Sequence, residues 1–203
     1  MIENISSDIV KRLLHYKIID YDRTSVYQYG FEIFISSMIT FMIAFVSGVI
    51  YKCLLAALIY FAIFALLRSI CGGYHAKTYL QCNTIYAFVT SFVLLFYKWI
   101  PMENFTGFHY VGLLFSIIVT AIYAPVQNEN KPLQTAQKQI LRIFSMATVI
   151  LLSLLSCLLE IEYRSSWCIL IDMTLFVVSF SMFITNPRRG VNKNEQNDQK
   201  ERS

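Results

Sequence analysis

The sequence has few charged residues for its length. Only 15% of its 203 residues are Asp, Glu, Lys or Arg, whereas soluble globular domains carry about 25%. Hydrophobic residues make up 56%, more than the interior of one water-facing domain of this size can hold. The composition therefore argues against a soluble enzyme, a nucleic-acid-binding protein and a disordered regulator, and it favours a single domain that lies mostly in lipid.

The sequence also lacks the short motifs of metal and disulfide chemistry. It contains no HExxH and no CxxC, so a zinc protease has little basis. Its three histidines, His15, His75 and His109, are far apart along the chain, and its five cysteines have no paired spacing typical of a disulfide framework. We therefore expect no metal site and no cofactor.

Six long apolar runs are the main feature of the sequence, each close to the roughly 20 residues that a helix needs to cross a bilayer. They are Phe31–Ile50, Cys53–Leu67, Asn83–Ile100, Phe108–Ala124, Ile143–Leu159 and Trp167–Thr185. The second run is short, about 15 residues before Arg68, so it tilts little, relies on the Arg68 side chain to reach the membrane surface, or is partly re-entrant. The runs predict an all-α, polytopic membrane protein with about six transmembrane helices in one domain over residues 31–186.

Polar segments flank this domain. In residues 1–30, apolar residues recur at helical spacing while charged residues occupy the other faces, which predicts an amphipathic helix. That helix lies either in the membrane interface or across the cytoplasmic mouth of the bundle. Residues 187–203 are almost wholly polar, and we expect a disordered cytoplasmic tail there.

Lysine and arginine are unevenly distributed around the apolar runs. Fourteen of the 17 lie in the two terminal segments and in the second-to-third and fourth-to-fifth connections, and the other three are Lys52, Lys98 and Arg164. Because cytoplasmic loops of membrane proteins are enriched in Lys and Arg, both termini and these two connections are predicted to be cytoplasmic.

The connection after the second run gathers several of the chain's uncommon residues. The adjacent Gly72 and Gly73 are expected to end the second transmembrane helix, because glycine adopts backbone angles closed to other residues. The pattern Thr78-x-x-Gln81 has the form of a capping box that begins the next helix. Cys82 then lies near the positive end of that helix, where a thiolate is favoured.

Two side chains of this predicted catalytic loop, residues 68–83, are placed to form a dyad. On a continuous helix, residues seven apart are about 10.5 Å apart along the axis, too far for proton transfer. His75 precedes the cap, so a loop can fold it back over the helix start. We predict His75 as the base and Cys82 as the nucleophile, with Cys71 as a competing nucleophile. The remaining cysteines, which we interpret as packing residues, are Cys53, Cys157 and Cys168.

Two acidic residues are placed unusually. Asp172 is the single acid well inside an apolar run, toward the predicted outer leaflet. It is either a polar packing partner, which we favour, or part of a path for substrate passage. Glu32 lies at the inner end of the first run and is a candidate to orient His75.

Two blocks of residues resemble a known family. Arg68-x-x-x-Gly72-Gly73-x-His75-Ala76, followed by Cys82, is similar to the signature of the accessory gene regulator B (AgrB) family. Tyr123-Ala124-Pro125 and Asn130-Lys131-Pro132-Leu133 resemble a second recurrent loop of that family. The length, the six apolar runs and the basic inner side also match, so the resemblance covers nearly the whole chain.

The resemblance implies a membrane cysteine endopeptidase of a Gram-positive bacterium that processes a quorum-sensing precursor peptide, AgrD. Cys82 would attack a carbonyl near the carboxyl end of the precursor, and a cysteine or serine of the precursor would then close a thiolactone or lactone ring. His75 would move the protons. The site would lie at the cytoplasmic face of the cell membrane, and the enzyme would need no cofactor and no nucleic acid.

The resemblance also implies roles for other residues. Arg68 would bind a substrate carboxylate or carbonyl, unless it only reaches toward the membrane surface from the helix end. Gly72 and Gly73 would shape the loop. Lys131 would attract an acidic tail of the precursor, or it would simply help to orient the chain in the membrane. The family further suggests a homodimer.

Two other functions remain open. The chain would be a small peptide exporter without proteolytic activity, which suits six helices and an intramembrane acid but does not require a thiol and an imidazole. It would otherwise be a scaffold for a sensor kinase. Variants at Cys82, Cys71 and His75 separate these functions.

Overall fold

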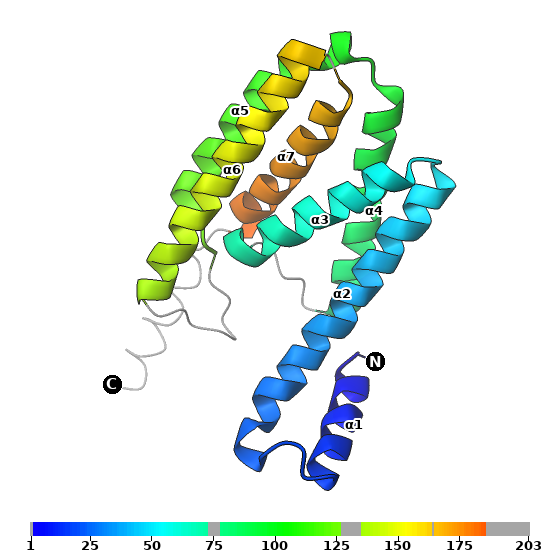
Figure 1. Ribbon diagram of the computed structural model, residues 1–203, viewed down its shortest axis with the longest axis vertical. Coiled ribbons are helices and arrows are strands. Elements are labelled where there is room, and N and C mark those ends of the chain that lie inside the picture. Colours follow the sequence, from blue (N-terminus) through cyan, green and yellow to red (C-terminus); the bar gives the residue numbers. More distant parts are fainter. Residues whose placement is uncertain (1, 73–77, 127–134, 164, 186–203) are drawn as a thin grey trace, which may run out of the picture.

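The computed structural model describes residues 2–72, 78–126, 135–163 and 165–185. Over these residues the chain forms seven α-helices and one short 3-10 turn, with no strand (Figure 1). Six of the helices are long and apolar enough to cross a membrane. The predicted all-α, multi-pass fold is thus confirmed. The elements are α1 Ile2–His15, η1 Tyr21–Arg23, α2 Thr24–Ile50, α3 Leu54–Cys71, α4 Tyr79–Trp99, α5 Met102–Tyr123, α6 Thr135–Tyr163 and α7 Trp167–Thr185.

Each predicted apolar run corresponds to one helix, but most helices extend beyond their run. α2 begins at Thr24 rather than at Phe31, and α6 begins at Thr135 rather than at Ile143. Hydropathy detects the part of a helix that needs lipid, whereas backbone hydrogen bonding continues through polar residues that reach the interface. Apolar runs therefore locate the helices more reliably than they locate the helix ends.

The second transmembrane helix is longer than its apolar run. α3 contains 18 residues and continues past Arg68 to Cys71, long enough to cross, which disfavours a partly re-entrant segment. Gly72 ends the helix with φ at +74°. A Cβ added to Gly72 would lie 2.6 Å from the carbonyl oxygen of Val126. Both the backbone angle and the available space therefore require glycine at this position.

α7 is the central helix of the bundle. It packs against α3, α4, α5 and α6, and Figure 1 shows it between the α5–α6 pair and α3. In the apolar stretch of α7, 61% of the residues are buried, against 17% in the apolar stretch of α2. Polar side chains of α7 are therefore surrounded by protein rather than by lipid.

The amino-terminal segment packs against the first transmembrane helix. Ile2, Ser6 and Val10 of α1 are buried, and α1 contacts α2. In Figure 1 α1 and the first half of α2 project from the rest of the bundle. The position of α1 relative to the membrane interface stays a prediction.

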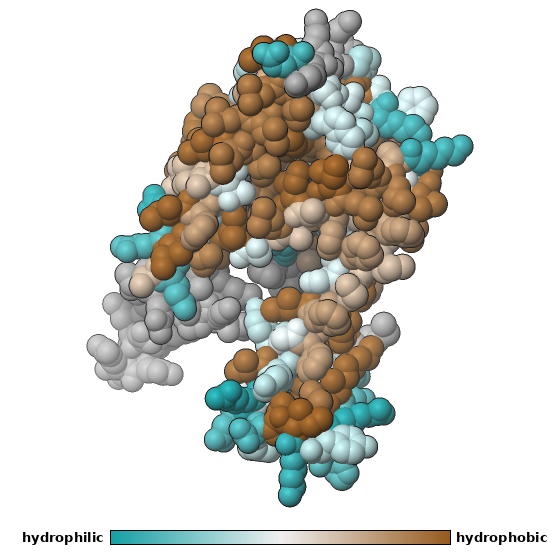
Figure 2. Space-filling view, viewed as in Figure 1, coloured by the Kyte–Doolittle hydropathy of each residue, from teal (hydrophilic) through white to brown (hydrophobic). Residues whose placement is uncertain are grey.

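The outer surface of the bundle is largely apolar. Figure 2 shows hydrophobic side chains over the visible faces of the bundle helices and hydrophilic side chains gathered toward the ends. Large residues such as Leu55, Phe88 and Leu151 are more than 60% exposed. A surface of this kind would associate or aggregate in water, so lipid is the medium that suits it.

Candidate active site

The thiol of Cys82 contacts the guanidinium group of Arg68. The Nη2 atom of Arg68 lies 3.8 Å from the Cys82 sulfur and donates a hydrogen bond to it. Arg68 lies in the last turn of α3 and Cys82 in the first turn of α4, so the two helix ends meet here. Both side chains are half-buried. The guanidinium group is therefore in hydrogen-bond contact with the candidate nucleophile.

A cap at the start of α4 fixes the backbone that carries Cys82. Thr78 is the N-cap residue, with extended backbone angles, and its Oγ1 atom accepts a 3.3 Å hydrogen bond from the amide of Gln81. The amide of Cys82 donates to the carbonyl of Thr78 over 3.1 Å, which closes the first helical turn. This half of the predicted capping box is confirmed, and the return bond from the Gln81 side chain stays a prediction.

The end of α3 is anchored by the connection that follows α5. The amide of Val126 donates a 2.9 Å hydrogen bond to the carbonyl of Cys71, and the hydroxyl of Ser145 on α6 donates to the carbonyl of Ile70 over 3.1 Å. These contacts satisfy carbonyls that a helix end leaves without partners. They also explain why Gly72 must be small, because Val126 lies directly against it. The segment around Ala124, which the sequence related to the second family block, therefore supports the end of α3, where the first block begins.

Glu32 holds the start of α4 against α2 and α1. The hydroxyl of Tyr79 donates a 2.8 Å hydrogen bond to Oε2 of Glu32. The other oxygen of Glu32 accepts from Ser6 on α1 and from Gln28 on α2, each over 3.3 Å. Tyr79 is the first residue of α4, so Glu32 positions the helical turn in which Cys82 lies. The sequence analysis selected Glu32 but not Tyr79. The position of Tyr79, three residues before the candidate nucleophile, could have indicated that its hydroxyl helps to position Cys82.

Three predicted site residues lie outside the described residues. They are His75, Gly73 and Lys131. The structure therefore describes the Cys82 half of the predicted dyad, together with Arg68 and Gly72, and the approach of His75 to Cys82 stays a prediction. The predicted link from Glu32 to His75 and the predicted tail at 187–203 also lie outside the described residues.

The competing thiols differ from Cys82 in their surroundings. Cys71 is fully buried in a hydrophobic cluster with Leu67 and Val126, where a peptide cannot reach it. Cys53 is half-buried and precedes α3, at the opposite end of that helix from Arg68. Burial raises the pKa of the Cys53 thiol, and the nearby charge of Lys98 partly opposes this shift. Cys82 is thus the thiol that best fits a peptide-cleaving nucleophile.

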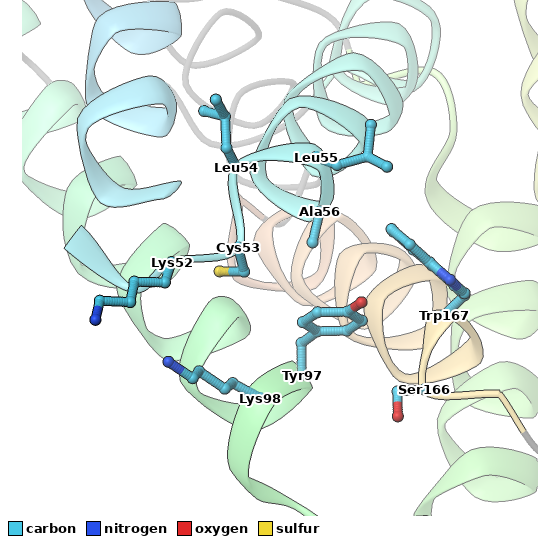
Figure 3. Close-up of a pocket in the computed structure, with 9 residues that line it drawn as sticks. All are labelled: Lys52, Cys53, Leu54, Leu55, Ala56, Tyr97, Lys98, Ser166 and Trp167. Carbon is cyan, nitrogen blue, oxygen red and sulfur yellow. The ribbon is translucent and has the colours of Figure 1, made fainter. Parts of the chain in front are cut away.

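The pocket around Cys53 is separate from Cys82. Figure 3 shows the side chains that line it, with Lys52 and Lys98 near the thiol and Tyr97 and Trp167 on the other side. They come from the end of α4, the start of α7, the connection before α3 and the first turn of α3. Cys82 lies at the start of α4 instead, so this pocket is not part of the candidate active site.

A second polar cluster lies inside the bundle. The Nδ1 atom of His109 on α5 lies 2.5 Å from Oδ2 of Asp172 on α7, and neither side chain is exposed to solvent. The hydroxyl of Ser156 on α6 donates to the other carboxylate oxygen, Oδ1, over 2.5 Å. This agrees with the interpretation of Asp172 as a polar packing partner. The sequence did not connect His109 with Asp172, because the two residues are far apart along the chain.

Two cysteines border this cluster. The sulfur of Cys157 lies 3.7 Å from Nε2 of His109. Ligand atoms of His109, Cys168 and Asp172 all lie within 4.8 Å of one another, and all three residues are buried. Both cysteines thus lie beside polar side chains of the bundle, and their interpretation as packing residues stays a prediction.

Comparisons with known proteins agree with the resemblance found in the sequence. The family model described as Accessory gene regulator B matches residues 2–184. An AgrB-like protein of Clostridium beijerinckii is 31% identical over 171 residues, which cover 84% of this chain and 82% of that protein. AgrB-like proteins from two strains of Clostridium perfringens are each 26% identical over 144 residues, or 68% of this chain and 67% of theirs. No solved structure matches the chain significantly.

Proposed function

This chain belongs to the accessory gene regulator B family, and we propose that it is a membrane cysteine endopeptidase that processes an AgrD-like precursor peptide. Family membership gives it a role in the agr quorum-sensing system. The six apolar helices make it a multi-pass membrane protein.

The contact between Arg68 and Cys82 carries the proposal. A nucleophilic cysteine needs a group that stabilises its thiolate, and the guanidinium of Arg68 lies 3.8 Å from the sulfur. The same group can donate to the oxyanion that forms when the sulfur adds to a carbonyl. The backbone amides of Gln81 and Cys82 already donate hydrogen bonds to Thr78. Arg68 is therefore a better candidate than these amides to donate to the oxyanion.

The reaction proceeds in two acyl transfers. His75 takes the proton of Cys82, the thiolate attacks a carbonyl carbon near the carboxyl end of the precursor, and the C–N bond breaks. The released amine takes the proton from His75, and the amino-terminal part stays on Cys82 as a thioester. A cysteine or serine of the precursor then attacks that thioester, which frees Cys82 and closes a thiolactone or lactone ring.

Ring closure depends on proximity and on the exclusion of water. Exchange of one thioester for another is close to balanced in free energy, so it needs no external energy source. A thiol tethered to the same acyl group has a high effective concentration and outcompetes water where water is scarce. The half-buried position of Cys82 at the start of a membrane-spanning helix suits this requirement.

Other parts of the proposal rest on charge and on family likeness. The distribution of Lys and Arg supports cytoplasmic termini and a cytoplasmic active site in a bacterial cell membrane. Gly73 would shape the loop with Gly72, and Lys131 would attract an acidic tail of the precursor. A homodimer would agree with the family, and the reaction needs neither a cofactor nor nucleic acid.

Co-expression with a tagged precursor tests the function. The wild-type chain and the variants Cys82→Ala, His75→Ala and Cys71→Ala are compared by mass spectrometry of the cell extract, with membrane levels of each chain checked by immunoblot. We expect no cleavage with Cys82→Ala or His75→Ala, and cleavage with Cys71→Ala. Intact precursor with the wild-type chain would contradict the proposal, and intact precursor in the medium would favour a peptide exporter.

A further inference from the structure

The polar cluster around His109 brings three helices together inside the bundle. His109 comes from α5, Ser156 and Cys157 from α6, and Cys168 and Asp172 from α7. Cys168 and Asp172 are four residues apart, so they share one face of α7. The cluster lies at the opposite end of the helices from Cys82, and none of its residues takes part in the proposed cleavage.

The atoms of this cluster are those that zinc prefers. Zinc binds thiolate sulfur, imidazole nitrogen and carboxylate oxygen, usually four of them in a tetrahedron. Ligand atoms of His109, Cys168 and Asp172 all lie within 4.8 Å of one another. The sulfur of Cys157 lies 3.7 Å from Nε2 of His109. A nitrogen and a sulfur on one tetrahedral zinc ion are about 3.5 Å apart, so these two atoms already have nearly the required spacing.

Asp172 prepares His109 to bind a metal ion. Its carboxylate lies 2.5 Å from Nδ1 of His109 and is held on its other side by Ser156. The hydrogen bond keeps the proton on Nδ1 and leaves the lone pair of Nε2 free to face Cys157. A carboxylate bound to the far nitrogen of a histidine is the usual support of a histidine ligand in metal sites.

The enclosure of the cluster indicates a structural site rather than a catalytic one. His109, Cys168 and Asp172 are each 0% exposed, so no substrate reaches them. A zinc ion held here would be shut off from any peptide, so its role would be to join helices rather than to act on a substrate. Burial of ionisable groups inside an apolar bundle costs free energy. Such groups within membrane spans usually have a function, such as binding an ion.

We propose that His109, Cys157 and Cys168 bind one zinc ion, with Asp172 orienting the imidazole of His109. Binding displaces the protons of the two thiols, and a Zn²⁺ ion with two thiolates and a neutral imidazole carries no net charge. The ion joins α5, α6 and α7 at the end of the bundle away from Cys82, and its binding free energy adds to the stability of the fold.

Metal analysis of the purified full-length chain tests the proposal. The chain is purified in detergent without chelators, incubated with Zn²⁺, freed of unbound metal and analysed by inductively coupled plasma mass spectrometry. We expect about one zinc per chain. A parallel sample loaded with Co²⁺ should absorb in the near ultraviolet through sulfur-to-cobalt charge transfer, and Cys168→Ser or Cys157→Ser should remove or weaken that absorption.

Matched variants separate ligands from neighbours. Asp172→Asn should weaken zinc binding about 10- to 100-fold and leave it detectable in excess zinc, because the amide oxygen still accepts the Nδ1 proton. Cys53→Ser, outside the cluster, and Cys82→Ala should each bind zinc like the wild type, so the outcome does not depend on peptide cleavage. A wild-type chain that is monodisperse and helical, yet binds neither zinc nor cobalt, would overturn the proposal. Full zinc occupancy in a Cys157→Ser, Cys168→Ser double variant would also overturn it.

Discussion

The hydroxyl of Tyr79 donates a hydrogen bond of 2.8 Å to the carboxylate of Glu32, which lies 47 residues earlier in the chain. This bond connects the first residue of α4 with α2, and Glu32 extends the connection to Ser6 on α1. Cys82 lies one turn further along α4, where it meets Arg68. The start of the helix that carries the candidate nucleophile is therefore positioned by contacts that involve α1, α2 and α3.

Removal of the Tyr79 hydroxyl should slow peptide processing. Tyr79→Phe deletes a hydrogen bond to a charged group, worth about 1.5 kcal/mol or more, and lets the start of α4 move. If half or more of that free energy is lost from the transition state, the cleavage rate in membrane vesicles falls roughly three- to tenfold. Tyr16→Phe, at an exposed position after α1, is the matched control and should cleave at the wild-type rate. Equal rates for both variants would show that this bond does not position Cys82.

Loss of the Arg68 charge should make Cys82 less reactive. In Arg68→Met the thiolate loses its charge-assisted hydrogen bond, so alkylation of Cys82 by iodoacetamide at neutral pH should slow by about tenfold. Arg68→Lys keeps the charge without the planar fork and should give an intermediate rate. The measurement is the rate of carbamidomethylation of Cys82, followed by mass spectrometry.

Arg142→Met is the control for the Arg68 variants. Arg142 lies near the same end of the bundle and donates to the carbonyl of Ala121 over 3.0 Å, away from Cys82. It should leave the alkylation of Cys82 unchanged. If both variants slow alkylation equally, the general positive charge of this face, and not the Arg68 contact, controls the thiol.

A side chain at Gly72 should destabilise the end of α3. Gly72→Ala must adopt φ near +74° and place its Cβ 2.6 Å from the carbonyl oxygen of Val126, which costs about 1–3 kcal/mol. The melting temperature in detergent should fall, and cleavage should fall with it. Gly107→Ala in α5, where no heavy atom lies within 4 Å of the added Cβ, should melt at the wild-type temperature or slightly above it. A Gly72→Ala variant as stable as the wild type would mean that Val126 moves aside without cost.

The thiol of Cys53 should report the orientation of the chain. It lies at the opposite end of α3 from Arg68, so a membrane-impermeant maleimide added to intact cells should label Cys53 and leave Cys82 unlabelled. Because burial raises the pKa of Cys53, its thiolate is scarce at neutral pH and labelling should accelerate as the pH rises. Lys98→Met removes the charge that lowers this pKa, so labelling at a given pH should be slower. Labelling of Cys82 from outside the cell would reverse the predicted orientation.

Hydropathy was sufficient to predict the six transmembrane helices but not their ends. Hydropathy missed the polar first turns of α2 and α6 and the last turn of α3. Backbone hydrogen bonds form in a helix whether its side chains are polar or apolar, so a helix continues beyond its apolar run. At Gly72 the interruption was readable from the sequence, and so was the cap at Thr78. These signals are local, since each depends on a few neighbouring residues.

The prediction of Cys82 and Arg68 as site residues also came from the sequence, through their spacing and their resemblance to a family. Their contact did not follow from it. The pairings of Tyr79 with Glu32 and of His109 with Asp172 were equally out of reach, because each joins residues from different helices. No local pattern encodes which faces of two helices meet.

The amino-acid sequence by itself thus determined that this protein lies mostly in lipid, how many spanning helices it has and where α3 ends and α4 begins. Those properties follow from composition, periodicity and capping, which act over a few residues. Tertiary structure alone decided that Arg68 contacts Cys82, that Cys71 is enclosed and that His109 meets Asp172. Helix packing around α7 sets these distances, because it fills space with side chains from the whole chain at once.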